Sequence, residues 1–202
     1  MNILLVHGLG RTPASLFPLA AALRKAKHRV HFFGYSTTLQ TWNRIVERLV
    51  VKLRTLASPV GLVGHSLGGL LLRAAIAKLP ELKVHHFVML GTPNRSPRLA
   101  GYFWRWLPFR MFTRTCGRLL AHSAESESLP IHDCPTTIFA GTAGPRGRLS
   151  PFGNDANDGL VAVSEAVLEG HPPPIEYLVL HTWIMNDRRI HAAIVDRMKG
   201  AK

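Results

Sequence analysis

The stretch Val60-Gly61-Leu62-Val63-Gly64-His65-Ser66-Leu67-Gly68-Gly69 decides the fold of this chain. An apolar run typical of a strand breaks here into G-x-S-x-G, and Leu67–Leu79 follows with helical spacing until a proline ends it. A serine held in a sharp turn between strand and helix needs small residues two positions before and two after it, where Gly64 and Gly68 stand. The pattern predicts a nucleophile elbow that presents Ser66, although an ordinary glycine-rich turn can carry the same letters.

Strands and helices alternate on both sides of this stretch, as in a parallel sheet covered by helices. Thr12-Pro13 should open a helix that bends or restarts at Pro18, Thr41 should cap a second helix, and Asn186 a last one over Asp187–Lys199, stopped by Gly200. The predicted fold is a three-layer α/β/α sandwich with a six-stranded, mainly parallel sheet, its first strand lying between the second and third. The expected strands are Asn2–Val6, Arg29–Phe33, Val60–Gly64, His86–Leu90, Thr136–Ala140 and Glu176–Leu180.

The length of 202 residues indicates one domain over residues 1–202. The chain opens directly on an apolar run without a basic leader, and no uncharged apolar stretch reaches 18 residues, so we expect a cytoplasmic, soluble protein. Two cysteines, Cys116 and Cys134, are too few for a disulfide framework and have no zinc-type spacing around them. We expect no cofactor and no metal, because the Asn/Asp cluster at 154–159 also fails the spacing of a calcium loop.

The charge is strongly and unevenly positive. The formal net charge is +13, and no acidic residue precedes Glu47. Between Glu81 and Glu125 there are seven cations and no acid. Such a field attracts phosphates on lipid headgroups, polyanions or substrates, although solubility alone also explains it, and we expect no specific nucleic-acid partner.

Residues 94–129 interrupt the alternation with an insertion rich in aromatic residues and arginine. Ser96-Pro97 and Pro108 suggest two short helices there. The segment could cap a pocket, face an anionic membrane, or pack on the sheet as an arginine-decorated helix pair. The residues expected to cover an acyl pocket are Trp104, Trp106, Phe109 and Phe112, with Arg105, Arg110 and Arg114 toward the anionic surface.

A serine hydroxyl becomes a good nucleophile only when a histidine oriented by a carboxylate takes its proton. In parallel-sheet proteins such residues gather at the carboxyl ends of the strands. Asp158 follows the fifth predicted strand and His181 ends the sixth, so the order Ser66, Asp158, His181 is that of α/β hydrolases. The alternatives are Asp155 for the acid, and His171 or His191 for the base.

The oxyanion of the intermediate needs two N–H donors. An elbow supplies one from the residue after the nucleophile, here Leu67, and the loop after the first strand supplies the other, here Leu9. His7 in that loop is expected to be structural.

These motifs together resemble a small α/β hydrolase of the lipase and esterase branch. The resemblance covers nearly the whole chain and rests on Val6-His7-Gly8-Leu9, Gly64-His65-Ser66-Leu67-Gly68-Gly69, Leu90-Gly91-Thr92-Pro93, Asn157-Asp158-Gly159-Leu160-Val161 and His181. It implies a triad of Ser66, Asp158 and His181, an oxyanion hole from Leu9 and Leu67, and no cofactor. Compared with larger relatives, we expect the chain to lack the first two strands.

The resemblance implies a serine hydrolase that cleaves a small-molecule acyl ester or lipid ester through an acyl-enzyme. The alternative is a non-catalytic protein of hydrolase fold that binds anionic lipid or another polyanion through the basic aromatic segment.

Overall fold

The computed structural model describes residues 1–95, 97–99, 104, 107–121, 129–130 and 132–199. Within α5, the description covers the backbone but not the side chains of residues 109, 110, 112, 114, 119 and 121.

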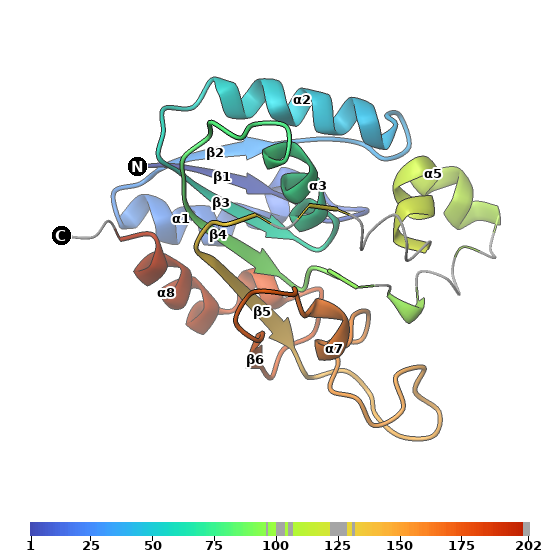
Figure 1. Cartoon of the computed structure of the whole chain (residues 1–202). Coiled ribbons are helices and arrows are strands. Elements are labelled where there is room, and N and C mark those ends of the chain that lie inside the picture. The colour runs from blue at the N-terminus through green and yellow to red at the C-terminus, as the bar shows by residue number, and fades with distance from the viewer. Residues whose placement is uncertain (96, 100–103, 105–106, 122–128, 131, 200–202) are drawn as a thin grey trace.

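A six-stranded sheet in the order β2-β1-β3-β4-β5-β6 forms the middle layer (Figure 1). Each of its neighbouring strand pairs is parallel. The predicted placement of the first strand between the second and third is therefore confirmed. The strands are β1 Asn2–Val6, β2 Arg29–Phe33, β3 Val60–His65, β4 Val84–Leu90, β5 Thr136–Gly141 and β6 Ile175–Tyr177.

Helices cover both faces of this sheet (Figure 1), which gives the predicted three layers. One buried apolar cluster joins the sheet to α2, α3 and α5, and a second joins its other face to α1 and α8. The helical elements are η1 Pro13–Leu16, α1 Phe17–Lys25, α2 Trp42–Arg54, α3 Leu67–Ile76, α5 Leu107–Ala121, α7 Val163–Ala166, η2 Ile184–Asn186 and α8 Arg188–Arg197. The short helix α7 was not predicted.

Among the predicted capping side chains, Thr41 makes its capping hydrogen bond and Thr12 makes none. The Thr41 hydroxyl accepts a hydrogen bond from the backbone N–H of Arg44 at 3.4 Å, as a cap should. Pro18 lies in the first turn of α1, directly after η1, so the predicted restart is confirmed. The predicted cap Asn186 was wrong. It belongs to η2, and the carboxylate of Asp187 caps α8 by accepting from the N–H of Arg189 at 2.8 Å.

The sixth strand differs most from the prediction of Glu176–Leu180. The observed β6 is Ile175–Tyr177, so it ends three residues before the predicted bound. Leu178 is 73% exposed and Leu180 is 41% exposed, so of the apolar residues 178–180 only Val179 packs against the core. The backbone N–H of His181 instead donates to the carbonyl of Asp158 at 2.9 Å. His181 therefore lies on a loop beyond β6 rather than at the strand end.

None of the helices in the described part of the chain is long and apolar enough to cross a bilayer.

Candidate active site

Ser66 lies in the turn between β3 and α3. Its backbone has φ +52° and ψ −123°, a region that residues other than glycine seldom adopt. Its N–H donates to the carbonyl of Leu90 at 2.8 Å, which ties the turn to the neighbouring strand β4. A strained backbone held by its surroundings is common at functional sites. Here the strained turn places Ser66 at the carboxyl edge of the sheet.

The glycines around Ser66 are required by close backbone contacts. A Cβ added at Gly64 would lie 2.5 Å from the Cα of Gly69, and one at Gly68 would collide with the carbonyl oxygens that end β1. A Cβ at Gly8 would lie 2.7 Å from His65 Nδ1 and 3.1 Å from the Cβ of Ser66. The loop after β1 therefore packs directly against the elbow.

Asp158 and His181 form a buried, hydrogen-bonded pair. The Nδ1 of His181 donates to Oδ2 of Asp158 at 2.7 Å, and the two residues are 6% and 2% exposed. The other carboxylate oxygen, Oδ1, accepts from the N–H groups of Leu160 at 2.9 Å and Val161 at 2.7 Å. Both oxygens of Asp158 are thus engaged, and with the proton on Nδ1 the second ring nitrogen of His181 is left as an acceptor.

The rival residues lie elsewhere. Asp155 is half exposed and pairs with Arg98 at 2.6 Å. His171 is half-buried and hydrogen-bonds to the carbonyl of Glu169, while His191 in α8 donates to the carbonyl of Met185 at 2.7 Å. Among the candidates, the structure brings together Asp158 and His181.

Gly91 lies beneath this pair, a role that the sequence did not reveal. Its φ is +54°, which favours glycine, and an added Cβ would lie 3.0 Å from His181 Nδ1 and 3.1 Å from Asp158 Oδ2. A larger residue would push the pair apart. In the sequence, Gly91 stood out only as part of the motif Leu90-Gly91-Thr92-Pro93. Its contact with Asp158 and His181 could not be predicted from that motif.

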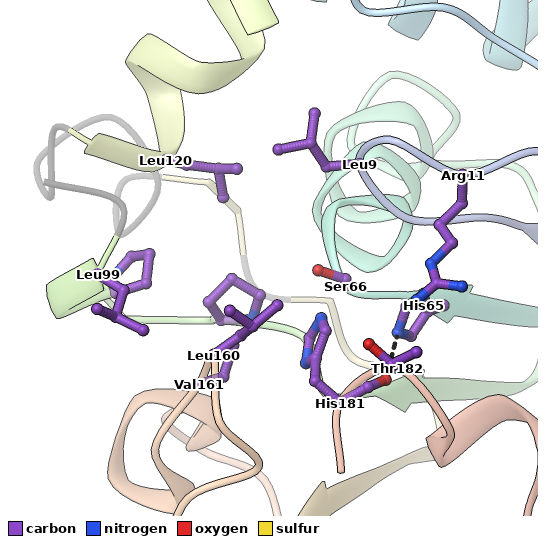
Figure 2. A pocket seen from close by; sticks show the side chains of 12 residues that line it. Leu9, Arg11, His65, Ser66, Leu99, Leu120, Leu160, Val161, His181 and Thr182 are labelled. Atoms are coloured by element: carbon purple, nitrogen blue, oxygen red, sulfur yellow. Dashed lines mark hydrogen bonds between the residues drawn. The ribbon is translucent and has the colours of Figure 1, made fainter. Parts of the chain in front are cut away.

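A cavity of about 220 Å³ opens beside Ser66 and His181, which both line it (Figure 2). Most of the remaining wall is apolar, and comes from Leu9, Pro93, Pro97, Leu99, Leu120, Leu160 and Val161. In the described part of the chain Ser66 has no side-chain hydrogen bond to His181. Contacts of this kind often shorten only when substrate binds.

The two predicted oxyanion donors lie on either side of the elbow. Leu67 is the first residue of α3, where backbone N–H groups have no partner within the helix. Leu9 follows Gly8 in the loop that contacts Ser66, and it lines the cavity. Within the described residues no hydrogen-bond acceptor is seen for the N–H of Leu9 or of Leu67. Leu9 lines the cavity, whereas Leu67 is fully buried and is not among the described lining residues.

His7 and His65 have positions that fit structural roles. The ring of His7 stacks on Tyr35 with centroids 4.3 Å apart, and the Tyr35 hydroxyl donates to the His7 carbonyl at 2.8 Å. His65 donates through Nε2 to the carbonyl of His181 at 3.2 Å. Burial lowers the pKa of His7, and burial together with the nearby His181 and Arg11 lowers the pKa of His65 well below its ordinary value. Both rings are therefore neutral at pH 7.

The described part of the 94–129 segment packs on the body through α5. Cys116 is fully buried, Leu120 lines the cavity, and the hydroxyl of Thr115 accepts from the N–H of Trp42 at 2.7 Å. A helix begins at Leu107, next to Pro108 as predicted, but it has 15 residues, so the prediction that it is short was wrong. Trp104 is half-buried. Trp106 and Arg105, and the side chains expected at 109, 110, 112 and 114, lie outside the described residues.

Arg73 in α3 anchors both ends of this segment, a role that was not predicted from the sequence. The side chain is 1% exposed; Nη1 donates to Oδ1 of Asn94 at 3.2 Å, and Nη2 donates to the carbonyl of Leu129. Burial lowers the pKa of Arg73 to about 10, so the group stays charged at neutral pH. A lone arginine on an apolar helix face was the only available signal.

The chain matches the model of the alpha/beta hydrolase family over residues 3–202, and it belongs to that family. No curated protein sequence matched in a separate search.

Several solved structures share the fold. The mature lipase BlEst2 of Bacillus licheniformis is similar with a TM-score of 0.75 and 20% identity, over 96% of this chain and 91% of that chain. The RedJ thioesterase of Streptomyces coelicolor gives 0.61 and 16%, over 98% and 90%. The phospholipase PlaB of Legionella pneumophila gives 0.64 and 16%, over 83% of this chain and 46% of that chain. These likenesses show the fold alone, and that fold agrees with the family match.

Proposed function

We propose that the protein is a serine hydrolase that cleaves carboxylic esters through an acyl-enzyme on Ser66. The observation that carries the proposal is the buried hydrogen bond of 2.7 Å between Asp158 and His181, in a cavity that Ser66 also lines. A carboxylate that fixes the ring and its tautomer leaves the other nitrogen to accept a proton. The names lipase, thioesterase and phospholipase among the structural neighbours agree with an acyl substrate.

In the proposed reaction, Nε2 of His181 takes the hydroxyl proton while Ser66 Oγ attacks the acyl carbon. The N–H groups of Leu9 and Leu67 would stabilise the oxyanion that forms. Collapse of the intermediate breaks the bond to the alcohol, which leaves with the proton held by His181. Water then attacks the acyl-enzyme with His181 again as base, and the carboxylic acid is released as Ser66 regains its proton.

We propose further that residues 94–129 form a cap on this site within one domain. Pro97 and Leu99 from the start of the segment and Leu120 from α5 all line the cavity, which supports this placement. The volume of about 220 Å³ lies below the range usual for drug-sized ligands. We therefore expect esters of short acyl chains to be favoured over long ones.

The test is a chain-length series of chromogenic esters with wild type and Ser66→Ala. Ser164→Ala is the matched control, because Ser164 is exposed on α7 and lines no described part of the cavity. Ser66→Ala should lose a factor of about a thousand or more in kcat, since the other triad members act only through the serine. Equal rates from Ser66→Ala and Ser164→Ala would refute the proposal.

A further inference from the structure

The cavity beside Ser66 has two unlike walls (Figure 2). Leu99, Leu120 and Leu160 lie on one side of the serine, and Arg11 lies on the other, with His65 and Thr182 next to it. Arg11 is close enough to His65 for its charge to lower the pKa of that ring, which agrees with the placement in the picture. The serine therefore lies between an apolar wall and a cationic one.

A tight turn holds Arg11 in this position. The backbone N–H of Arg11 donates to the carbonyl of Gly8 at 3.3 Å, and Gly10, the third residue of the turn, has φ +65°. That conformation favours glycine, which explains the second glycine of His7-Gly8-Leu9-Gly10. Because Gly8 itself packs on His65 and Ser66, the turn fixes the base of the Arg11 side chain against the elbow.

The positive charge of Arg11 has no counter-charge in the cavity. Among the described lining residues, Arg11 alone carries a fixed charge. The ion pairs seen in the described part of the chain involve other cations, and both oxygens of Asp158, the buried acid of the site, are already engaged. His65 stays neutral through burial. An arginine in this state is a ready partner for a carboxylate or phosphate, which its planar donors can bind with two hydrogen bonds.

The position of Arg11 also indicates which part of a substrate it meets. His65 hydrogen-bonds to the backbone of His181, so the Arg11 wall lies on the side of the histidine. In the proposed reaction, His181 passes its proton to the leaving alcohol. The alcohol portion therefore faces Arg11, and the hydrocarbon of the acyl portion faces the leucines.

We propose that Arg11 binds an anionic group, a carboxylate or a phosphate, on the alcohol portion of the ester substrate. This rests on the proposed serine esterase function and names its substrate class: a short acyl chain esterified to an anionic alcohol. The net charge of +13, with no acid among the first 46 residues, would steer such substrates toward this wall.

Three butanoyl esters with matched alcohols test the proposal: those of glycerol, glyceric acid and glycerol 3-phosphate. Wild type should prefer at least one anionic ester over the neutral one by about ten- to a hundredfold in kcat/KM, as charge-assisted hydrogen bonds of this kind provide. Arg11→Gln should bring that ratio close to one, chiefly through KM, and Arg11→Lys should restore part of it. Arg146→Gln, which changes an exposed arginine in the loop after β5, should leave the ratio as in wild type. The better anionic ester then tells whether the group is a carboxylate or a phosphate.

A binding measurement separates this proposal from the hydrolytic one. Butyl phosphate should bind to Ser66→Ala about tenfold or more tightly than to Ser66→Ala/Arg11→Gln, as measured by calorimetry at low salt. If no ester is cleaved but this difference is found, the hydrolase proposal fails and the anion site stands. If wild type cleaves neutral and anionic esters equally, or if Arg11→Gln leaves the ratio or the binding of butyl phosphate unchanged, the role of Arg11 is overturned.

Discussion

The two halves of the candidate active site are held in different ways. Ser66 is positioned by steric contact: the strand and helix that flank it are fully buried, and Gly64 meets Gly69 so closely that no side chain fits between them. Asp158 and His181 lie on loops, and hydrogen bonds hold them, through the N–H groups of Leu160 and Val161 and through the bond between the two side chains.

This difference predicts different responses to mutation. A change in the serine half should disturb packing, and therefore stability, because backbone atoms cannot move aside in a dense core. A change in the Asp158–His181 half should disturb proton transfer while the fold survives, because each loop is also held by backbone hydrogen bonds. The experiments below test that contrast, from the largest expected effect to the smallest.

Asp158→Asn should give the largest loss of activity with an intact fold. The amide cannot accept the Nδ1 proton of His181 while keeping both N–H contacts, so the ring is left in the wrong tautomer, and kcat should fall by about a thousandfold or more. Asp155→Asn is the matched control, because Asp155 is half exposed and outside the site. Ester hydrolysis and circular dichroism measure the two quantities. Similar kcat values for the two variants would contradict the assigned role of Asp158.

Gly64→Ala should destabilise the fold by about 1 to 3 kcal/mol, the usual cost of overpacking. Its new methyl group would meet backbone atoms of Gly69, which cannot give way. Gly61→Ala in the same strand is the control: there the methyl group would lie 2.6 Å from the sulfur of Met198, whose flexible side chain can move. Urea unfolding compares the two. The contrast fails if Gly61→Ala is the more damaging change.

Cys116 should resist thiol reagents in the folded protein. It belongs to α5 and is fully buried, and burial raises its pKa to about 12, so only about one part in ten thousand is thiolate at pH 8. Cys134, which is half-buried, should react faster in wild type. A Cys134→Ser variant isolates Cys116, and mass spectrometry follows its labelling with and without urea. Rapid labelling of native Cys116 would mean that α5 lifts from the body.

We expect the smallest effect of mutation at the surface of residues 94–129, on membrane binding. Leu107 and Met111, one turn apart on α5, are 64% and 65% exposed, beside a segment rich in arginine. We propose contact with anionic membranes, where each arginine near the surface contributes about 1 kcal/mol. Arg105→Gln/Arg110→Gln/Arg114→Gln should weaken co-sedimentation with anionic vesicles, and salt should weaken it for wild type. If wild type does not co-sediment with such vesicles at low ionic strength, the membrane contact is refuted and the segment acts only as a cap.

The sequence predicted the sheet well because its central strands are continuous apolar runs. β1 and β2 have the predicted bounds, and β3 and β5 are each one residue longer. The sixth strand was misplaced, because Leu178 and Leu180 look like core residues but carry the chain out to His181. An apolar pattern alone cannot tell a strand from a loop that is fixed by a distant hydrogen bond.

The residues of the candidate site also differ in how well the sequence predicts them. Ser66 could be predicted from a local motif, since strand, turn and helix are adjacent in sequence. Gly91, Arg73 and Arg11 could not, because their roles depend on contacts with residues far along the chain. The glycine needed beneath Asp158 and His181 and the arginine left without a counter-charge become visible only after the loops are placed.

Labelling by a fluorophosphonate probe tests the central claim most directly, because the probe reacts only with an activated serine. Wild type should be labelled at one position, Ser66, as identified by peptide mass spectrometry. His181→Ala should be labelled far more slowly and Ser66→Ala not at all, while His191→Ala, a buried histidine in α8 away from the cavity, should react like wild type. Wild type that stays unlabelled, or a label on another serine, would contradict the account.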